Sequence, residues 1–324
     1  MSTPPFISSA VCEKLIDPAR AVDLAERALR WEANGEVEYP VPRGLRMKTQ
    51  DKRLTFHSKA VALPAIGVLG CRIVGYRVDA DGSRPDADSS TRLVMLMDLS
   101  TGSPVAIVDE HYNYSLRTAA SIGVAAKYLA GPGPVLGLVG AGAVAQAVAA
   151  VMLDTLPLEG IHLFSRSRPR CQALAQSVSE KTDLPVTVCD SLEQVINSAN
   201  VVVTATTARS PFIKAQDLRP SVLLCALGSN ELEGEVYTSC DRLVVDDWLQ
   251  TQSASDIAGL IADGCAVESK LSAELPEIIA GIKPGRQSPT ETIIVRTEGL
   301  ASQDIALAHW AWQEAERQGL CQSR

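Results

Sequence analysis

A glycine turn inside residues 135–146 (VLGLVGAGAVAQ) constrains this chain more than any other feature. The apolar run at 135–139 has the length of a buried strand, and small residues then begin a helix. In such a unit Gly140 permits a sharp turn, Gly142 lets a pyrophosphate approach the backbone, and Ala145 allows close helix–sheet packing. The phosphates would lie at the helix N-terminus, so the segment predicts the nucleotide-binding end of a Rossmann domain. The expected contacts are Gly140, Ala141, Gly142, Ala143 and Val144.

Strand and helix patterns alternate after this turn, which predicts an α/β fold with a doubly wound parallel sheet. Short apolar runs indicate strands at 135–139, 161–164, 186–188, 201–204, 222–226 and 243–245. Helical patterns lie at 143–153, 168–181 and 192–198.

The part of the chain before the turn is expected to be sheet-rich α+β. A helical pattern at 17–31 precedes alternating apolar runs at 54–63, 70–78 and 92–98, and a helix is expected at 115–129. The Gly-Pro stretch at 131–134 is typical of a domain boundary. Periodicity also predicts a helix at 302–318 but assigns it to neither domain.

Length and composition narrow the function classes. A chain of 324 residues exceeds what one core organises, so two domains are expected. The net charge of -8 argues against nucleic acid or an anionic membrane as the main partner. The eight cysteines form no C-x-x-C pair and no zinc-ligand spacing, so we expect free thiols and no metal. Without a signal-like or membrane-spanning apolar run, the expected location is the cytoplasm.

The end of the second Rossmann strand bears on the choice of cofactor. An acidic residue there would bind the ribose 2′-hydroxyl of NAD, but the sequence is Ser165-Arg166-Ser167-Arg168. Two guanidinium groups and two hydroxyls suit a 2′-phosphate, so NADP(H) is favoured and NAD(H) stays possible. The alternative is that Arg166 and Arg168 are solvated residues at a helix start.

Several segments together make the whole chain, from Phe6 onward, resemble the ornithine cyclodeaminase/μ-crystallin family. They are 116–120 (LRTAA), 140–142 (GAG), 203–206 (VTAT), 228–230 (GSN), 244–247 (VVDD) and 299–304 (GLASQD). The resemblance implies a homodimer, with 1–115 plus 303–324 as the substrate-binding and dimerisation domain and 116–302 as the Rossmann domain. It also implies further cofactor contacts from Thr204, Ala205, Thr206, Gly228 and Gly299.

The resemblance also implies a set of substrate residues. Arg117 matches the family arginine that holds the substrate carboxylate, and Arg43 resembles a second arginine of that clamp in a looser alignment. Arg72 stands where the family has a lysine; because a guanidinium keeps its proton, Arg72 could orient a carboxylate but not act as the acid. Lys59 could supply the missing ammonium group, since alternation puts it on one strand face with His57. His57 is either a second proton donor or a structural residue.

Asn230 bears on the reaction type. Cyclodeaminases resemble one another in an aspartate at this place, and an amide cannot act as a base, so Asn230 would contact substrate or nicotinamide, beside Thr206, or finish a turn. The favoured reaction is therefore NAD(P)H-dependent reduction of an imine or ketimine next to a carboxylate, formed in some cases from a 2-oxo acid and an amine. The alternatives are a redox-neutral, cyclodeaminase-like lyase with tightly bound NAD and a non-enzymatic NADP-binding protein. The Asp-rich stretch at 79–88 is expected to be a solvated loop.

Overall fold

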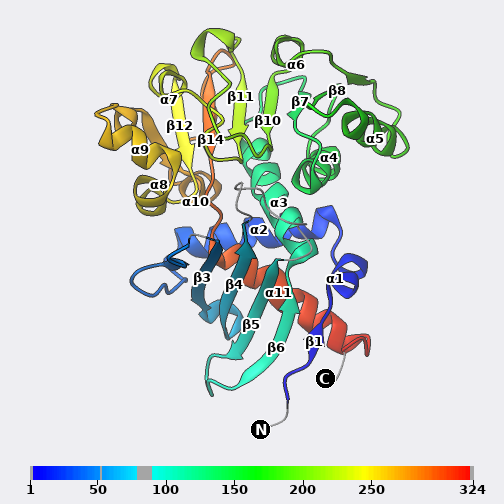
Figure 1. Ribbon diagram of the computed structural model, residues 1–324, viewed down its shortest axis with the longest axis vertical. Helices are drawn as coiled ribbons and strands as arrows, with labels where there is room; N and C mark the ends of the chain where they lie inside the picture. Colours follow the sequence, from blue (N-terminus) through cyan, green and yellow to red (C-terminus); the bar gives the residue numbers. More distant parts are fainter. Residues whose placement is uncertain (1–2, 52, 79–89, 322–324) are drawn as a thin grey trace. The chain divides into compact units, whose positions relative to one another are not determined.

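The computed structural model describes residues 3–51, 53–78 and 90–321, and these form two compact units (Figure 1). The first unit comprises Met1–Arg117 and Leu300–Arg324, and the second comprises Thr118–Gly299. The chain leaves the first unit within helix α3 (His111–Leu129) and returns just before helix α11 (Ala301–Arg317). The boundaries expected from the sequence differ from these by two and three residues. The loop expected at 79–88 lies outside the described residues.

The second unit is built on a parallel sheet, which confirms the predicted doubly wound fold. In the described part of the chain its strand order is β13-β12-β14-β11-β10-β7-β8-β9. The order reverses between β7 and β10, and a crevice forms outside the carboxyl ends of strands at such a point. The strands are β7 (Val135–Val139), β8 (Gly160–Phe164), β9 (Val186–Val188), β10 (Val201–Thr204), β11 (Leu223–Ala226), β12 (Arg242–Val245), β13 (Leu271–Glu274) and β14 (Ile293–Arg296).

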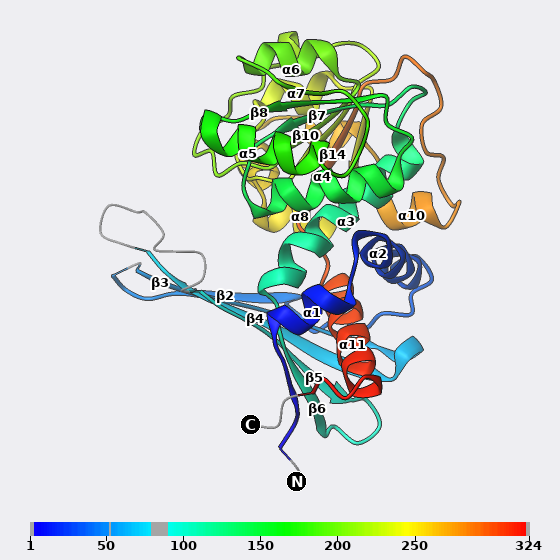
Figure 2. The ribbon, with the colours of Figure 1, turned by 90° about the vertical axis from the view of Figure 1, so that its right-hand side faces the viewer.

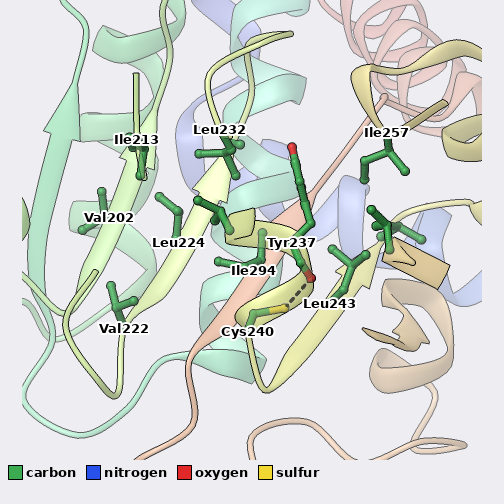
Figure 3. Packing of buried hydrophobic residues seen from close by; sticks show 14 of the residues in the cluster. Val202, Ile213, Val222, Leu224, Leu232, Tyr237, Cys240, Leu243, Ile257 and Ile294 are labelled. Atoms are coloured by element: carbon green, nitrogen blue, oxygen red, sulfur yellow. Dashed lines mark hydrogen bonds between the residues drawn. The ribbon is translucent and has the colours of Figure 1, made fainter. Parts of the chain in front are cut away.

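The central strands are short apolar runs because they are buried on both faces. Val202, Leu224, Leu243 and Ile294, each from a different strand, pack in one cluster with Tyr237 (Figure 3). The helices of this unit are α4 (Ala143–Thr155), α5 (Arg168–Ser179), α6 (Leu192–Ser198), α7 (Gly234–Ser239), α8 (Trp248–Ala254), α9 (Asp256–Ala262) and α10 (Leu275–Ile279).

Glycine permits a close helix approach beneath the nucleotide end of the sheet. A Cβ on Gly137 would lie 2.7 Å from Val195 Cγ1 and 2.8 Å from the Ala199 side chain. Helix α6, which begins after the N-cap Ser191, therefore packs tightly on β7. This contact fixes the strand that leads into the glycine turn.

The first unit is a sheet with helices on one face. Its described strands follow the order β1-β6-β5-β4-β3-β2, with β1 parallel to β6 and the other neighbours antiparallel. Helix α11 lies along the sheet (Figure 2), so the helix that periodicity left unassigned belongs to this unit. The elements are β1 (Phe6–Ile7), α1 (Ser9–Leu15), α2 (Pro18–Ala33), β2 (Gly44–Lys48), β3 (Leu54–Leu63), β4 (Val68–Arg77), β5 (Thr91–Asp98) and β6 (Pro104–Asp109).

The two faces of this sheet differ in burial. One face, here called the covered face, carries Val61, Gly70 and Leu96 and packs on α11; a Cβ on Gly70 would lie 2.3 Å from Ile305 Cδ1. The opposite face, here called the open face, is apolar and half-exposed. Its side chains include Phe56, Leu69, Cys71, Ile73, Leu93, Met95 and Met97.

Candidate active site

A cavity of about 520 Å³ lies at the carboxyl ends of the strands of the second unit. It is surrounded by the glycine turn, the end of β8 and the loop after β10. The lining residues are Val139, Gly140, Ala141, Gly142, Phe164, Ser165, Arg166, Ser167, Arg170, Leu192, Ala205, Thr206, Thr207, Ala208, Arg209, Ser210 and Phe212. The cavity therefore occupies the place where the sequence predicts a dinucleotide.

The glycine turn fits a pyrophosphate for two separate reasons. Gly140 has a φ of +126°, and a Cβ there would lie 2.3 Å from the carbonyl oxygen of Ala205, so no other residue can make this turn. A Cβ on Gly142 would meet nothing within 4 Å, so this glycine leaves open space at the wall of the cavity. Gly142 is also the N-cap of α4, without a side-chain cap and without an acid in the first turn. The amides at this helix end are thus suited to an anion.

One arginine differs from expectation at the end of β8, here called the base end of the cavity, where the adenosine ribose of a dinucleotide would lie. Ser165, Arg166 and Ser167 line the cavity, but Arg168 does not, since its guanidinium pairs with Asp190. Arg170 lines the cavity instead. Helix α5 begins at Arg168, and positions two apart on a helix are rotated by about 200° around its axis, so they point to nearly opposite sides. Of the two arginines named from the sequence, Arg166 thus lines the cavity and Arg168 does not.

Glu231 links the residues expected around the nicotinamide, and no sequence pattern pointed to it. Its buried carboxylate accepts hydrogen bonds from the Thr204 hydroxyl (2.6 Å), the Thr206 hydroxyl (2.6 Å), the Thr206 amide (2.8 Å) and the Gly228 amide (2.8 Å). Thr204 is the last residue of β10, and Gly228 follows β11. Glu231 therefore joins the loops after two neighbouring strands.

Asn230 and Gly299 both adopt left-handed backbone conformations. Asn230 has a φ of +59°, is exposed, and its amide donates to Asp256 Oδ2 at 3.3 Å, so it finishes a turn. Gly299 has a φ of +78°, and its amide donates to the buried carboxylate of Asp246 at 2.7 Å. The loop at Gly299 is thus fixed by a buried acid of the same unit.

The first unit holds a buried charge cluster made of Arg72, Glu110, Arg117 and Asp304. Arg72 Nε lies 2.5 Å from Glu110 Oε1 and 3.6 Å from Asp304 Oδ2. Arg117 Nε lies 2.7 Å from Asp304 Oδ1, an ion pair rather than a directed hydrogen bond. All four residues are buried, so two desolvated cations are compensated by two desolvated anions.

The cluster changes how its members titrate. Burial, and then the charge of Asp304, raise the pKa of Glu110 to about 7. Burial also acts to raise the pKa of Asp304, but the charges of Arg117 and Arg72 outweigh it and hold that pKa below its usual range. Burial opposes the charge of Arg72, yet the two acids raise its pKa further. Arg72 therefore keeps its proton, as its side-chain chemistry predicts.

Lys59 and His57 lie on the covered face, as their alternation predicts. Lys59 pairs with Arg72 across β3 and β4, and its charge helps to lower the pKa of Asp304. Burial, followed by the charges of Lys59, Arg46 and Arg72, lowers the pKa of His57 to about 4. His57 is thus neutral near pH 7 and has no acidic proton of the imidazolium kind to donate. Of the two candidates, Lys59 therefore remains the one for proton donation.

Arg43 packs on an aromatic ring of the first unit. Its guanidinium carbon is 4.4 Å from the ring centroid of Tyr39, whose hydroxyl donates to Glu32. Ser302, two residues before Asp304, donates to the same carboxylate at 2.5 Å. The structure therefore groups Lys59, Arg72 and Arg117 around Asp304, whereas Arg43, which precedes the partner of Lys59 on β2, packs on Tyr39.

Glu110 and Tyr114 were not expected as site residues. Glu110 lies between β6 and α3, and Tyr114 is one helical turn before Arg117. A single acid at a strand end carries no pattern that a sequence can reveal.

In the described ranges, no helix is long and apolar enough to span a membrane, and no group of three His, Cys, Asp or Glu side chains could hold a metal. All eight cysteines are free thiols.

A glycine turn on a doubly wound sheet, with a cavity beside it, defines a dinucleotide-binding protein of the Rossmann class. The chain belongs to the ornithine cyclodeaminase/mu-crystallin family, whose model matches residues 7–319, so the resemblance noted in the sequence is confirmed.

Relatives match this chain over almost its whole length. It is 27% identical over 322 residues to a Delta(1)-pyrroline-2-carboxylate reductase of Bacillus cereus, covering 97% of both chains. It is 25% identical to an N-((2S)-2-amino-2-carboxyethyl)-L-glutamate dehydrogenase of Staphylococcus aureus, covering 92% of this chain and 91% of the relative. The structure of a Thermococcus litoralis Delta(1)-pyrroline-2-carboxylate reductase in complex with NADH and L-proline superposes with a TM-score of 0.90 at 25% identity, covering 99% and 100% of the two chains.

Proposed function

We propose that this protein is an NAD(P)H-dependent reductase of a C=N bond next to a carboxylate, with an amino or imino acid as product. The observation that carries the proposal is the buried charge cluster, which holds Arg117 in place beside Lys59. The names of the similar reductase and dehydrogenase support the same reaction class.

Arg117 would bind the carboxylate next to the C=N bond. Its guanidinium is fixed by Asp304, so little side-chain freedom is lost when a carboxylate binds. Arg72 pairs with Glu110 and shares Asp304 with Arg117, so its role is to hold these acids and thereby Arg117. Fixing the substrate carboxylate in this way restricts the imine carbon to one orientation, which contributes to rate through positioning.

Lys59 would protonate the imine nitrogen. Its ammonium group lies on the covered face with Arg72, whose proton cannot be released. A bound nicotinamide supplies the hydride. Asn230 cannot act as a base, which argues against the lyase alternative.

We further infer that the cofactor is NADP(H). Arg166 and Arg170 both line the base end of the cavity, with Ser165 and Ser167 between and beside them. None of the cavity-lining residues described above is an acid that could hold a 2′-hydroxyl. Planar guanidinium groups and hydroxyls together suit a 2′-phosphate.

The open face supports a homodimer as the working form. Its side chains are apolar and half-exposed across β3, β4 and β5, and Leu45 and Met47 on β2 extend it with exposures of 60% and 59%. Contiguous apolar patches of this kind usually mark association surfaces. A second copy of the same sheet offers a matching face, as two-fold symmetry requires.

The function is tested by mixing the protein with NADPH, cyclic imino acids such as Delta(1)-pyrroline-2-carboxylate, and pairs of a 2-oxo acid with methylamine. We expect oxidation of NADPH with at least one of them and formation of the matching secondary or cyclic amino acid. Arg117→Met should raise KM strongly, whereas Arg20→Met, which removes an exposed arginine of α2, should not. If neither NADPH nor NADH is oxidised with any of these substrates, the proposal is contradicted.

A further inference from the structure

Three arginines surround the ring of Tyr114. The guanidinium carbons of Arg92, Arg117 and Arg72 lie 4.1, 5.0 and 5.4 Å from its centroid. They come from β5, α3 and β4, so three separate elements place positive charge around one phenol ring. An aromatic face attracts guanidinium groups and also holds them in a fixed plane.

The three arginines differ in how their charge is balanced. Arg72 and Arg117 pair with Glu110 and Asp304 inside the buried charge cluster. Arg92 donates from Nε to the Ser90 hydroxyl at 3.1 Å, and no described acid forms an ion pair with it. Within the described residues, neither terminal nitrogen of Arg92 has a hydrogen-bond partner. Its planar fork is therefore available to a ligand.

Positive charge also exceeds negative charge on this part of the covered face. Arg92 and His57 lie in one cross-strand row through Val74, and Arg72 and Lys59 lie in the next row. Arg46 extends the first row beside His57. The five cations Arg46, Lys59, Arg72, Arg92 and Arg117 thus outnumber Glu110 and Asp304, the two acids of the charge cluster, so one substrate carboxylate would leave this group of residues positive.

We propose that Arg92, held on Tyr114, forms a second carboxylate subsite, so that the preferred imine carries two carboxylates. This inference rests on the proposed function. Arg117 would bind the carboxylate next to the C=N bond, and Arg92 the distal one. Both guanidinium carbons lie within 5.0 Å of one ring centroid, so a short skeleton of about four or five carbons is long enough to present one carboxylate to each. A half-buried guanidinium binds a carboxylate through two parallel hydrogen bonds, which are stronger than neutral ones.

The kinetic test compares imines that differ in the distal group. With NADPH and methylamine, 2-oxoglutarate supplies the dicarboxylate and 2-oxopentanoate the monocarboxylate of equal chain length. We expect the dicarboxylate imine to be preferred in kcat/KM by about 10- to 100-fold, because a charge-assisted hydrogen bond contributes about 1.5–3 kcal/mol. Arg92→Met should remove the preference by raising KM for the dicarboxylate alone, and Arg92→Lys should restore part of it.

Arg20→Met is a matched control, because Arg20 also stacks on an aromatic ring, 4.5 Å from the Trp310 centroid, in the same unit. It should leave the preference unchanged. An equal effect of Arg92→Met on both imines, or equal kcat/KM for the two imines in the unaltered protein, would overturn the subsite.

Thermal unfolding in the absence of cofactor gives a readout without activity. Glutarate should raise the Tm of the unaltered protein more than butyrate does, and Arg92→Met should abolish that difference. A larger shift with inorganic phosphate than with glutarate would overturn the carboxylate assignment. If no imine is reduced but the glutarate shift depends on Arg92, the subsite stands and the proposed reaction fails. If monocarboxylate imines alone are reduced, the reaction stands and the subsite fails.

Discussion

Arg117 Nε lies 2.7 Å from Asp304 Oδ1, although the whole second unit separates these residues in the chain. The pair joins the start of α3 to the start of α11, and both side chains are buried. An arginine held by a buried acid is already oriented before a ligand arrives. Because each buried charge neutralises the other, removing either Arg117 or Asp304 should lower the free energy of unfolding.

Asp304→Asn should destabilise the protein by about 3 kcal/mol, because it leaves Arg117 and Arg72 short of a buried negative charge. The matched control is Asp23→Asn, which breaks the exposed 3.2 Å pair with Arg20 and should change the free energy of unfolding by less than about 1 kcal/mol. Urea denaturation of the three proteins measures both effects. Similar losses in the two variants would contradict the compensating role of Asp304.

Glu110 should make stability depend on pH near neutrality. Its pKa is about 7 in the folded protein against an ordinary value of 4.5, so the folded state binds the proton more tightly than the unfolded state. The resulting stabilisation is complete below pH 4.5 and is lost as the pH rises through 7. Relative to Glu110→Gln, the unaltered protein should therefore lose stability between about pH 5 and 7, by at most about 1.4 kcal/mol per pH unit. A pH-independent difference between the two proteins would show that Glu110 does not titrate there.

Arg170 and Arg168 should contribute differently to cofactor binding. Arg170→Met should weaken NADPH binding by about tenfold or more and leave NADH binding nearly unchanged, because only NADPH carries the 2′-phosphate. Arg168→Met removes a side chain that pairs with Asp190 and should affect neither cofactor. Fluorescence titration with both nucleotides measures the dissociation constants. Equal weakening for NADH and NADPH in Arg170→Met would refute the NADP assignment.

Substitutions of the two glycines of the turn should have different effects on stability and on cofactor binding. Gly140→Ala should lower both stability and dinucleotide affinity, since its Cβ would lie 2.3 Å from a backbone oxygen at a φ of +126°. Gly142→Ala should keep its stability, because its Cβ meets nothing within 4 Å and its φ is -89°. It should nevertheless lose affinity for NADPH. Thermal unfolding and cofactor titration separate the two outcomes, and unimpaired binding by Gly142→Ala would contradict the pyrophosphate placement.

The open face should control assembly. Met47→Glu puts a charge on this face at an exposed position, so it should weaken self-association without unfolding the chain. Leu249→Glu is the control, because Leu249 is similarly exposed at 57% but lies on α8. Sedimentation velocity should show a dimer for the unaltered protein and the control, and a shift toward monomer for Met47→Glu. A monomeric unaltered protein would exclude the proposed dimer.

Local patterns were enough to predict much of the fold. The runs of β7, β9, β10 and α6 have the predicted bounds, because each is a short apolar or amphipathic segment between turn residues. By contrast, β14 was not predicted, and its insertion between β11 and β12 depends on pairing that no local pattern contains. Strand β2 was also missed, since it is largely exposed and lacks a buried alternation.

The residues of the candidate site also divide into those that a local sequence pattern predicts and those that depend on the tertiary fold. Gly140 and Gly142 were predictable because a turn geometry demands them at fixed spacing. Glu110 and Glu231 were not, because each acts through partners brought close by separate elements. Arg170 was missed for another reason: α5 begins at Arg168 as predicted, but which of its side chains turns toward the cavity depends on how the helix is rotated against the sheet.

The position of Asp304 on α11 has a consequence for biosynthesis. During translation Arg72 and Arg117 emerge long before Asp304, and the entire Rossmann unit is made in between. Until α11 is synthesised, Gly70 lacks the helix that fills its side of the sheet, and Arg117 lacks the acid that neutralises it. Domains usually fold in the order in which they leave the ribosome. Here the unit that begins first must be completed last, so we expect the Rossmann unit to form before the unit that contains the buried charge cluster.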